Sequence, residues 1–188
     1  MEKAILAKIE KEAPHILKTG AYQTGFKEGK STAIHATTLL EQIHPGKGKQ
    51  ARKYAALIDL QKAYDTVIRE KLWGILRDRC KSIEENTLVE LIVRMHQHST
   101  ITIGNHSFNA ARGVVQGSVL SPFLFNIYMD EALNSNRKLG RIKARGDLLA
   151  FADDMLVLTN SEPEMAEVIR HLDGLQADWN LRMNKKKS

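Results

Sequence analysis

Apolar positions recur every three to four residues in several long segments of the chain, the spacing of an amphipathic helix. Helices are therefore predicted over residues 2–18, 31–43, 69–80, 84–96, 121–133 and 161–179. Pro14 interrupts the first of these segments. Ser161 followed by Glu164 is typical of a capping box and indicates where the last helix begins.

Shorter segments carry the patterns of strands. Residues 54–60 (YAALIDL) form a nearly continuous apolar run, which predicts a strand buried on both faces. Alternating residues around Gly104-Asn105 predict one hairpin, and two apolar arms around Asp153-Asp154 predict another. The strands expected beyond the first cover residues 100–103, 107–111, 148–151, 155–159 and, as a last edge strand, 181–183.

The order of these elements predicts an α+β fold, with an antiparallel sheet and helices on one of its faces. A chain of 188 residues can form one domain with a sizeable core, or one domain and part of a second. The apolar fraction of 43% is that of ordinary globular proteins. The segment 44–49 is predicted to be a basic, exposed loop.

Charge and cysteine content narrow the function classes. The 28 Lys and Arg residues exceed the 22 Asp and Glu residues, which suits a polyanionic partner, although a solvated basic surface would give the same balance. A single cysteine, Cys80, excludes an internal disulfide and a cysteine-rich zinc site and fits a reducing, intracellular setting. No apolar run approaches the roughly 20 residues that span a bilayer, so no membrane partner is expected.

Carboxylates stand at two unusual places in the predicted sheet. Asp59 lies near the end of an apolar strand, and Asp153-Asp154 interrupt an apolar hairpin. Each place alone could be a capped turn, but adjacent carboxylates repel each other until a proton or a cation relieves them. If the two strands are neighbours, the carboxylates converge and offer the oxygen ligands that Mg²⁺ prefers.

Converging carboxylates suggest metal-assisted phosphoryl transfer. Two Mg²⁺ ions roughly 3.5–4 Å apart activate an attacking 3′-hydroxyl and stabilise a departing pyrophosphate. The protein then mainly positions groups and neutralises charge. A nuclease with the same carboxylates stays open at this point.

Five segments, two of which contain these aspartates, resemble in order the motifs of reverse transcriptases. They are more similar to the motifs of non-LTR retrotransposons and group II introns than to those of retroviruses. The resemblance covers about residues 23–188. The segments are 23–32 (QTGFKEGKST), 59–67 (DLQKAYDTV), 112–122 (RGVVQGSVLSP), 151–154 (FADD) and 184–188 (NKKKS).

The resemblance implies a polymerase palm with partial fingers: residues 1–53 as partial fingers and 54–188 as palm, with a helical insertion around 69–98. No thumb is expected within these residues. The implied reaction is RNA-templated DNA synthesis, in which deoxynucleotides are added to the 3′-hydroxyl of a primer annealed on RNA. Two Mg²⁺ ions, or Mn²⁺ in their place, are the implied cofactors.

Catalytic roles follow from the matched motifs. Asp59 and Asp153 would be the chief metal ligands, and Asp154 would support them. Lys187 would sit near the leaving pyrophosphate and donate a proton to it. By itself, a lysine within Lys185–Lys187 is more often a solvated charge.

Substrate-binding roles follow in the same way. Tyr64 would stack under the incoming sugar and exclude a 2′-hydroxyl by collision; its plain alternative is a packed core aromatic. Gln116 would contact the nucleotide, Gly117 would let backbone approach the base pair, and Lys30 would bind substrate. The residues expected to line the nucleic-acid side are Lys27, Lys30, Lys47, Lys49, Arg52, Lys53 and, with an equal chance of simply facing solvent, Arg112.

Two rival interpretations belong to other classes. A truncated reverse transcriptase-like domain could act as an RNA-binding or assembly subunit without polymerase activity, and the missing thumb favours it unless a longer chain or a partner subunit supplies one. Intact motif residues favour the enzyme. A P-loop around Gly25 and Gly29 is rejected, because that motif needs four residues between its glycines and a preceding apolar strand.

Overall fold

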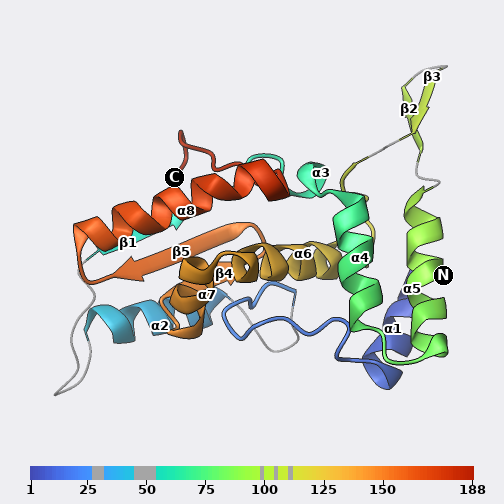
Figure 1. Ribbon diagram of the computed structural model, residues 1–188, viewed down its shortest axis with the longest axis horizontal. Helices are drawn as coiled ribbons and strands as arrows, with labels where there is room; N and C mark the ends of the chain where they lie inside the picture. The colour runs from blue at the N-terminus through green and yellow to red at the C-terminus, as the bar shows by residue number, and fades with distance from the viewer. Residues whose placement is uncertain (27–31, 45–53, 98–99, 104–105, 110–111) are drawn as a thin grey trace. The chain divides into compact units, whose positions relative to one another are not determined.

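The structure is a computed structural model that describes residues 1–26, 32–44, 54–97, 100–103, 106–109 and 112–188. It is α+β, as the sequence predicts (Figure 1). In chain order the elements are α1 (Glu2–Glu12), α2 (Thr32–Ile43), β1 (Tyr54–Ile58), α3 (Ala63–Thr66), α4 (Arg69–Arg79), α5 (Ile83–Gln97), β2 (Thr100–Ile103), β3 (His106–Asn109), α6 (Ser121–Ser135), α7 (Arg137–Ala144), β4 (Leu148–Phe151), β5 (Asp154–Thr159) and α8 (Glu162–Trp179).

The chain divides into two compact units. The first unit comprises Met1–Thr19 and Tyr64–Glu131, and the second comprises Gly20–Ala63 and Ala132–Ser188. These units are defined by compactness, whereas the expected division into fingers (residues 1–53) and palm (54–188) is a division by function. That division stays a prediction.

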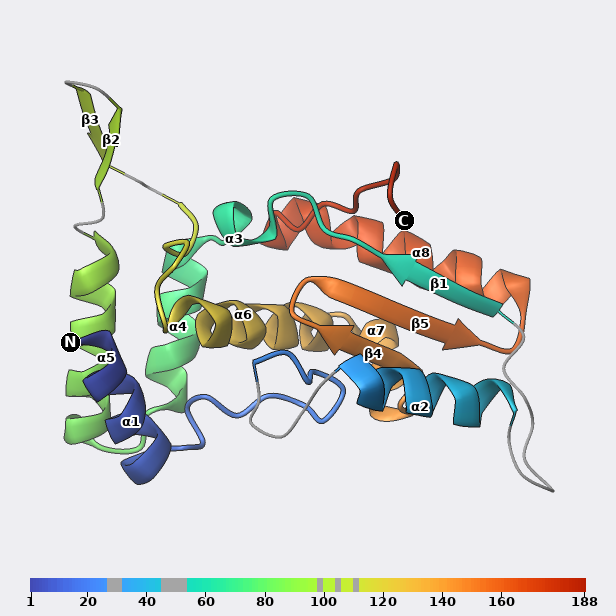
Figure 2. The ribbon, with the colours of Figure 1, turned by 180° about the vertical axis from the view of Figure 1, so that it is seen from behind.

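An antiparallel sheet with the strand order β1-β5-β4 forms the centre of the second unit. Ile58 pairs with Met155 on β5, and Leu149 of β4 pairs with Leu156. Helices α7 and α8 lie on one face and α2 on the other (Figures 1 and 2). The expectation of helices on a single face is therefore wrong, because Leu149 and its apolar neighbours on β5 need cover that Leu39 of α2 supplies.

The strands differ in burial. Strands β4 and β5 are almost completely buried, in line with their apolar sequences. The prediction that β1 is buried on both faces is wrong: Leu57 is 70% exposed and Tyr54 is 39% exposed. β1 is an edge strand of this sheet, and the α2 face is covered over β4 and β5 instead.

Segments outside the strands pair with both edges of the sheet. Gln23 forms a parallel bridge with Ala150 of β4, and Met183 forms an antiparallel bridge with Leu60, just beyond β1. The predicted strand 181–183 is wrong as an element, since among the residues that the structure describes it forms only the bridge of Met183 to Leu60. The segment is too short for a longer strand, because the chain changes direction on both sides of it. Asn180 adopts left-handed backbone at φ 53°, and a turn begins at Asn184.

The first unit packs α1 and α4 against α5. α1 ends at Glu12 rather than continuing to residue 18, because Pro14 cannot donate a helical hydrogen bond and disfavours helical backbone before it. The hairpin of β2 and β3 is confirmed, with Ile101 opposite Phe108. Its predicted turn residues, 104–105, lie outside the described residues, as does 45–49 of the predicted basic loop.

The remaining predicted helices are confirmed within a few residues, and α3 and α7 are additional. Ser161 caps α8 by accepting a hydrogen bond from the Glu164 N–H, as the sequence indicates. Trp179, at the other end of α8, donates from Nε1 to Ser135 Oγ at 2.9 Å. Among the described helices, none has the length and apolarity to cross a bilayer.

Candidate active site

Asp59 directly follows β1, where the C-terminal segment reaches the sheet. Asn184 binds it twice: Nδ2 donates to Asp59 Oδ2 at 2.7 Å, and the Asn184 N–H donates to the Asp59 carbonyl at 2.8 Å. The Asp59 N–H donates to Ser188 Oγ at 3.2 Å. These contacts fix both the backbone and the carboxylate of Asp59.

Asp153 and Asp154 lie where β4 turns into β5. The turn passes through Ala152, which adopts left-handed backbone at φ 56°, and Asp154 is the first residue of β5. Ile58 pairs with Met155, so the position after Ile58 lies beside Asp154 on the adjacent strand. The expectation that the two strands are neighbours is confirmed, and their carboxylates come to the same end of the sheet.

The carboxylates influence one another electrostatically. The pKa of Asp153 is raised, first by burial and further by the negative charges of Asp154 and Asp59, while the positive charge of Lys187 works in the opposite direction. A cation between these oxygens would relieve the repulsion. Within the described residues, no group of three or more His, Cys, Asp or Glu side chains is already arranged to hold a metal ion.

Lys187 lies beside the carboxylates on the turn that follows Asn184. Its Nζ is 4.0 Å from Asp59 Oδ2, and 71% of its side chain is exposed. A long exposed ion pair of this kind contributes little to stability. The ammonium group is therefore held only loosely and can turn toward another anion.

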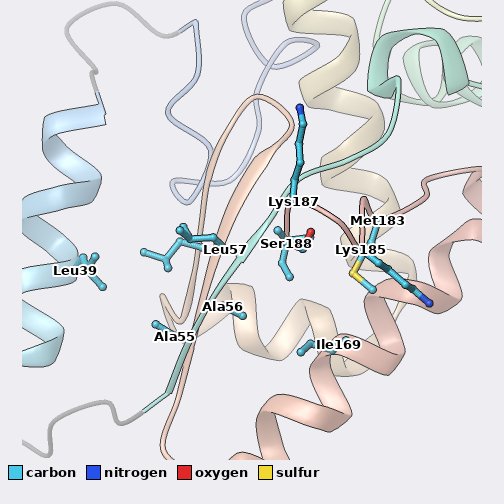
Figure 3. A pocket seen from close by; sticks show the side chains of 11 residues that line it. Leu39, Ala55, Ala56, Leu57, Ile169, Met183, Lys185, Lys187 and Ser188 are labelled. Atoms are coloured by element: carbon cyan, nitrogen blue, oxygen red, sulfur yellow. The ribbon is translucent and has the colours of Figure 1, made fainter.

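An apolar pocket of about 670 Å³ opens along β1 in the second unit. Leu57 points toward Leu39 of α2, and Ile169 of α8 lies on the other side of the strand (Figure 3). Lys187 belongs to the rim, and its side chain points away from the apolar lining. Asp59 is not among the lining residues, so this pocket is not the carboxylate site.

Three of the four predicted substrate-binding residues, Tyr64, Gln116 and Gly117, belong to the first unit. A second pocket, of about 320 Å³, is lined by Tyr64, Gln116, Gly117, Ser118, Ser121 and Pro122. The Tyr64 ring stacks on Phe125, with centroids 5.0 Å apart and planes inclined by 14°. One face of Tyr64 is thus packed, as its plain alternative expects, while the side chain still lines an open pocket.

Backbone contacts hold the two halves of this pocket together. The Val114 N–H donates to the Tyr64 carbonyl, and the Gly113 N–H donates to the Val67 carbonyl, both at 2.9 Å. Gly113 has φ +80°, and a Cβ there would lie 2.9 Å from Asp65 Cα, so a side chain does not fit. The buried Arg69 guanidinium donates from Nε to the Gly113 carbonyl at 2.7 Å. Tyr64 and the segment leading to Gln116 are consequently positioned as one piece.

Gln116 and Gly117 are both exposed where they line this pocket. Gln116 Nε2 donates to Asp65 Oδ1 at 3.1 Å on the exposed side of the pocket. Gly117 adopts φ +85°, and a Cβ at this position would meet no atom within 4 Å, so its glycine is required by backbone conformation rather than by crowding. The remaining predicted side chains are less informative: Arg112 is exposed, and Lys30 lies outside the described residues with Lys27, Lys47, Lys49, Arg52 and Lys53.

Two residues that sequence reasoning did not single out contact the carboxylate site. Asn184 orients Asp59 through the hydrogen bonds given above. Gln23 is completely buried and hydrogen-bonds the Ala152 backbone beside Asp153. Both stand inside segments that carry the family resemblance, but their partners lie 125 and 129 positions away, which no local pattern reveals.

A family profile described as reverse transcriptase (RNA-dependent DNA polymerase) matches residues 1–188, the whole chain. The Pol polyprotein of the type-1 retrotransposable element R2 from Nasonia vitripennis is 26% identical over 172 residues, which are 88% of this chain and 17% of that protein. The R2 polyprotein from Popillia japonica is 28% identical over 88% of this chain and 24% of its own length. The chain thus spans about a fifth of these relatives.

Solved structures share the fold. Apo telomerase from Candida tropicalis, truncated from its C-terminal domain, matches with a TM-score of 0.69 and 16% identity over 98% of this chain and 39% of that one. Telomerase from Candida albicans, in complex with a fragment of telomeric RNA, matches with a TM-score of 0.66 and 13% identity over 99% of this chain and 32% of its own. At these identities the likeness concerns the fold alone.

Proposed function

The chain belongs to the reverse transcriptase family, and from that membership we propose that it carries out RNA-templated DNA synthesis, extending the 3′-hydroxyl of a primer annealed on RNA with deoxynucleotides. The observation that carries the proposal is the meeting of Asp59 with Asp153 and Asp154 at one end of paired strands. The fold and the order of motifs agree with it.

The carboxylates are proposed to hold two divalent cations, Mg²⁺ or Mn²⁺. Asp59 and Asp153 are the principal ligands in this proposal, and Asp154 is the supporting one. The donor set fits, because it is made of the oxygens that such cations prefer. The pKa of Asp153 is raised chiefly by burial and further by the negative charges of Asp154 and Asp59, which a bound cation would offset. When bound, such ions supply charge neutralisation for the attacking and leaving oxygens.

The residues around the carboxylates have separate tasks. Asn184 keeps one Asp59 oxygen turned toward itself at 2.7 Å, which fixes the direction of the other oxygen. Lys187, loosely held 4.0 Å from Asp59, is the proposed proton donor to the departing pyrophosphate. Its exposure lets it move toward the phosphates as they arrive.

Nucleotide selection is proposed to depend on the pocket of the first unit. Tyr64 is braced by Phe125, so its ring cannot retreat from a 2′-hydroxyl without losing that stacking contact. Gln116 would exchange its hydrogen bond to Asp65 for one to the nucleotide. Gly117 leaves the backbone open for the base pair, and Lys30 is the proposed further substrate contact.

Primer extension tests the proposal. The chain is incubated with an RNA template, an annealed DNA primer, Mg²⁺ and deoxynucleotides, in parallel with Asp153→Asn. Asp173→Asn is the matched control, because Asp173 is an exposed carboxylate on α8 of the same unit that pairs with the exposed Lys185. We expect extension by the parent and the control, and a loss of at least a hundredfold in Asp153→Asn, since a ligand of the reacting ions is removed.

Other outcomes discriminate between the alternatives. A folded chain that binds the RNA–primer duplex but extends nothing would favour the RNA-binding or assembly role. Cleavage of the RNA without extension would favour a nuclease. Equal extension by parent and Asp153→Asn would refute the assignment of the carboxylates.

A further inference from the structure

The turn that carries Asp153 has a backbone conformation that needs support. Ala152 lies at φ 56°, a left-handed conformation that residues other than Gly, Asn and Asp seldom adopt. Residues in such conformations persist only where their surroundings hold them, and they gather at functional sites. The residue immediately after Ala152 is a proposed metal ligand, so the support of this turn bears on the site.

Gln23 supplies that support with one side chain. Its Nε2 donates to the Ala152 carbonyl at 3.0 Å, and its Oε1 accepts from the Ala152 N–H at 2.9 Å. Oε1 also accepts from the Gly25 N–H at 3.0 Å. The amide therefore binds both polar groups of Ala152, and its side chain is 0% exposed. In this buried setting water cannot easily replace either bond.

The segment around Gln23 is fixed against the same hairpin. The Thr24 N–H donates to the Ala150 carbonyl at 2.9 Å, and the Ala150 N–H donates to the Tyr22 carbonyl at 2.8 Å. At Gly25 an added Cβ would lie 2.5 Å from the Ala152 nitrogen, so the backbone passes closer than any side chain allows. Gln23 is thus held in register with the turn and reaches it without strain in its own backbone.

From these contacts we propose that Gln23 is a positioning residue for the carboxylate site: its buried amide holds Ala152 in the left-handed conformation that directs Asp153 toward Asp59. The proposal rests on the function proposed above in assigning Asp153 to a metal ion. It adds to the proposed site a residue that lies 129 positions from Ala152 in the sequence. In this proposal Gln23 contacts neither the ion nor the substrate.

The test measures Mn²⁺ affinity by electron paramagnetic resonance on the full chain, without primer or nucleotide. Gln23→Met keeps the size of the side chain and removes its hydrogen bonds. The matched control is Gln42→Met, because Gln42 Nε2 donates to the Gly146 carbonyl at 3.0 Å, near the opposite end of β4. We expect Gln23→Met to weaken Mn²⁺ binding by about tenfold, the equivalent of roughly 1.4 kcal/mol, and Gln42→Met to leave it unchanged.

A second substitution distinguishes a positioning role of Gln23 from a general role in packing. Glycine adopts left-handed backbone without the Cβ penalty, so Ala152→Gly should restore part of the Mn²⁺ affinity of Gln23→Met. A merely structural Gln23 would show no such rescue. If Gln23→Met does not fold, Gly25→Ala takes its place, because the added Cβ presses on the Ala152 nitrogen and on Gln23 Oε1 and should likewise weaken Mn²⁺ binding. Gly174→Ala, whose Cβ would meet nothing within 4 Å, is its control.

The outcomes for this inference and for the proposed function differ. The parent chain could bind Mn²⁺ and extend no primer, while Gln23→Met binds Mn²⁺ more weakly than the parent. That result would support the positioning role of Gln23 and refute the polymerase function. A folded Gln23→Met chain with the parent's Mn²⁺ affinity overturns the positioning role, and so does a parent that binds no Mn²⁺. In an active parent, Gln23→Met should lower kcat and leave KM for the deoxynucleotide unchanged.

Discussion

At the scale of residues, the proposed site consists of three aspartates and of two amide side chains, Asn184 and Gln23, that hydrogen-bond to Asp59 and to the turn before Asp153. Asp59, Asp153 and Asp154 stand out because carboxylates in apolar strands need a reason to be there. Asn184 and Gln23 are ordinary amides whose importance depends on contacts with residues far along the chain. A local pattern cannot report which distant backbone an amide will meet.

Asn184 offers a prediction at this scale. Its hydrogen bond to a carboxylate is of the stronger, charge-assisted kind. Asn184→Ala releases the Asp59 side chain to rotate, so we expect kcat for primer extension to fall about tenfold, roughly 1.4 kcal/mol of activation free energy, with KM for the deoxynucleotide unchanged. Steady-state kinetics check this.

Asn134→Ala is the control for that measurement, because Asn134 also uses its side chain in a hydrogen bond, which it accepts from the half-buried Lys143. It should behave as the parent does. A rise in KM at constant kcat in Asn184→Ala would contradict the orienting role and would place Asn184 in nucleotide binding instead.

At the scale of elements, the periodicity of apolar residues predicts the long helices and both hairpins. It fails to predict helix α7 and the exposure of β1, and each of these errors has a local cause. Helix α7 was missed because its sequence is largely basic, although Asn136 caps it by accepting from the Lys138 and Leu139 N–H groups. That asparagine was a signal available in the sequence. The exposure of β1 was not, because an apolar run is equally apolar in a central strand and in an edge strand.

The cap of α8 gives the prediction at this scale. Ser161 Oγ satisfies the Glu164 N–H, one of the amides that the first helical turn leaves without a partner. Ser161→Ala should lower the free energy of unfolding by about 1 kcal/mol without changing its dependence on urea concentration. Thr37→Ala, in the exposed middle of α2, should be neutral or slightly stabilising. Urea unfolding followed by circular dichroism checks both, and equal effects would rule out a capping contribution.

At the scale of the whole molecule, the sequence motifs fall into two separate compact units. The carboxylates belong to the second unit, whereas Tyr64 and Gln116 belong to the first. Sequence order could not show this, since Asp59 and Tyr64 are near neighbours in a single motif. The unit boundary at Ala63 passes directly through that motif.

The second unit is made of two segments that are separated in the sequence, Gly20–Ala63 and Ala132–Ser188. This separation has a consequence for how the protein folds. The β4–β5 hairpin is local and can close within microseconds, whereas β1 reaches β5 only after a loop that contains most of the first unit has been closed. Contacts between distant segments tend to form late. In kinetic unfolding and refolding experiments, Ala56→Gly in β1 should therefore mainly speed unfolding, whereas Leu149→Ala in the hairpin should slow folding.

Refolding slowed equally by both substitutions would contradict this order. If the order holds, a partly folded chain exposes the unpaired edge of β5, the arrangement that invites other chains to add strands. The same step that protects this edge brings Asp59 to Asp153. The proposed carboxylate site and resistance to aggregation would then be acquired at the same step of folding.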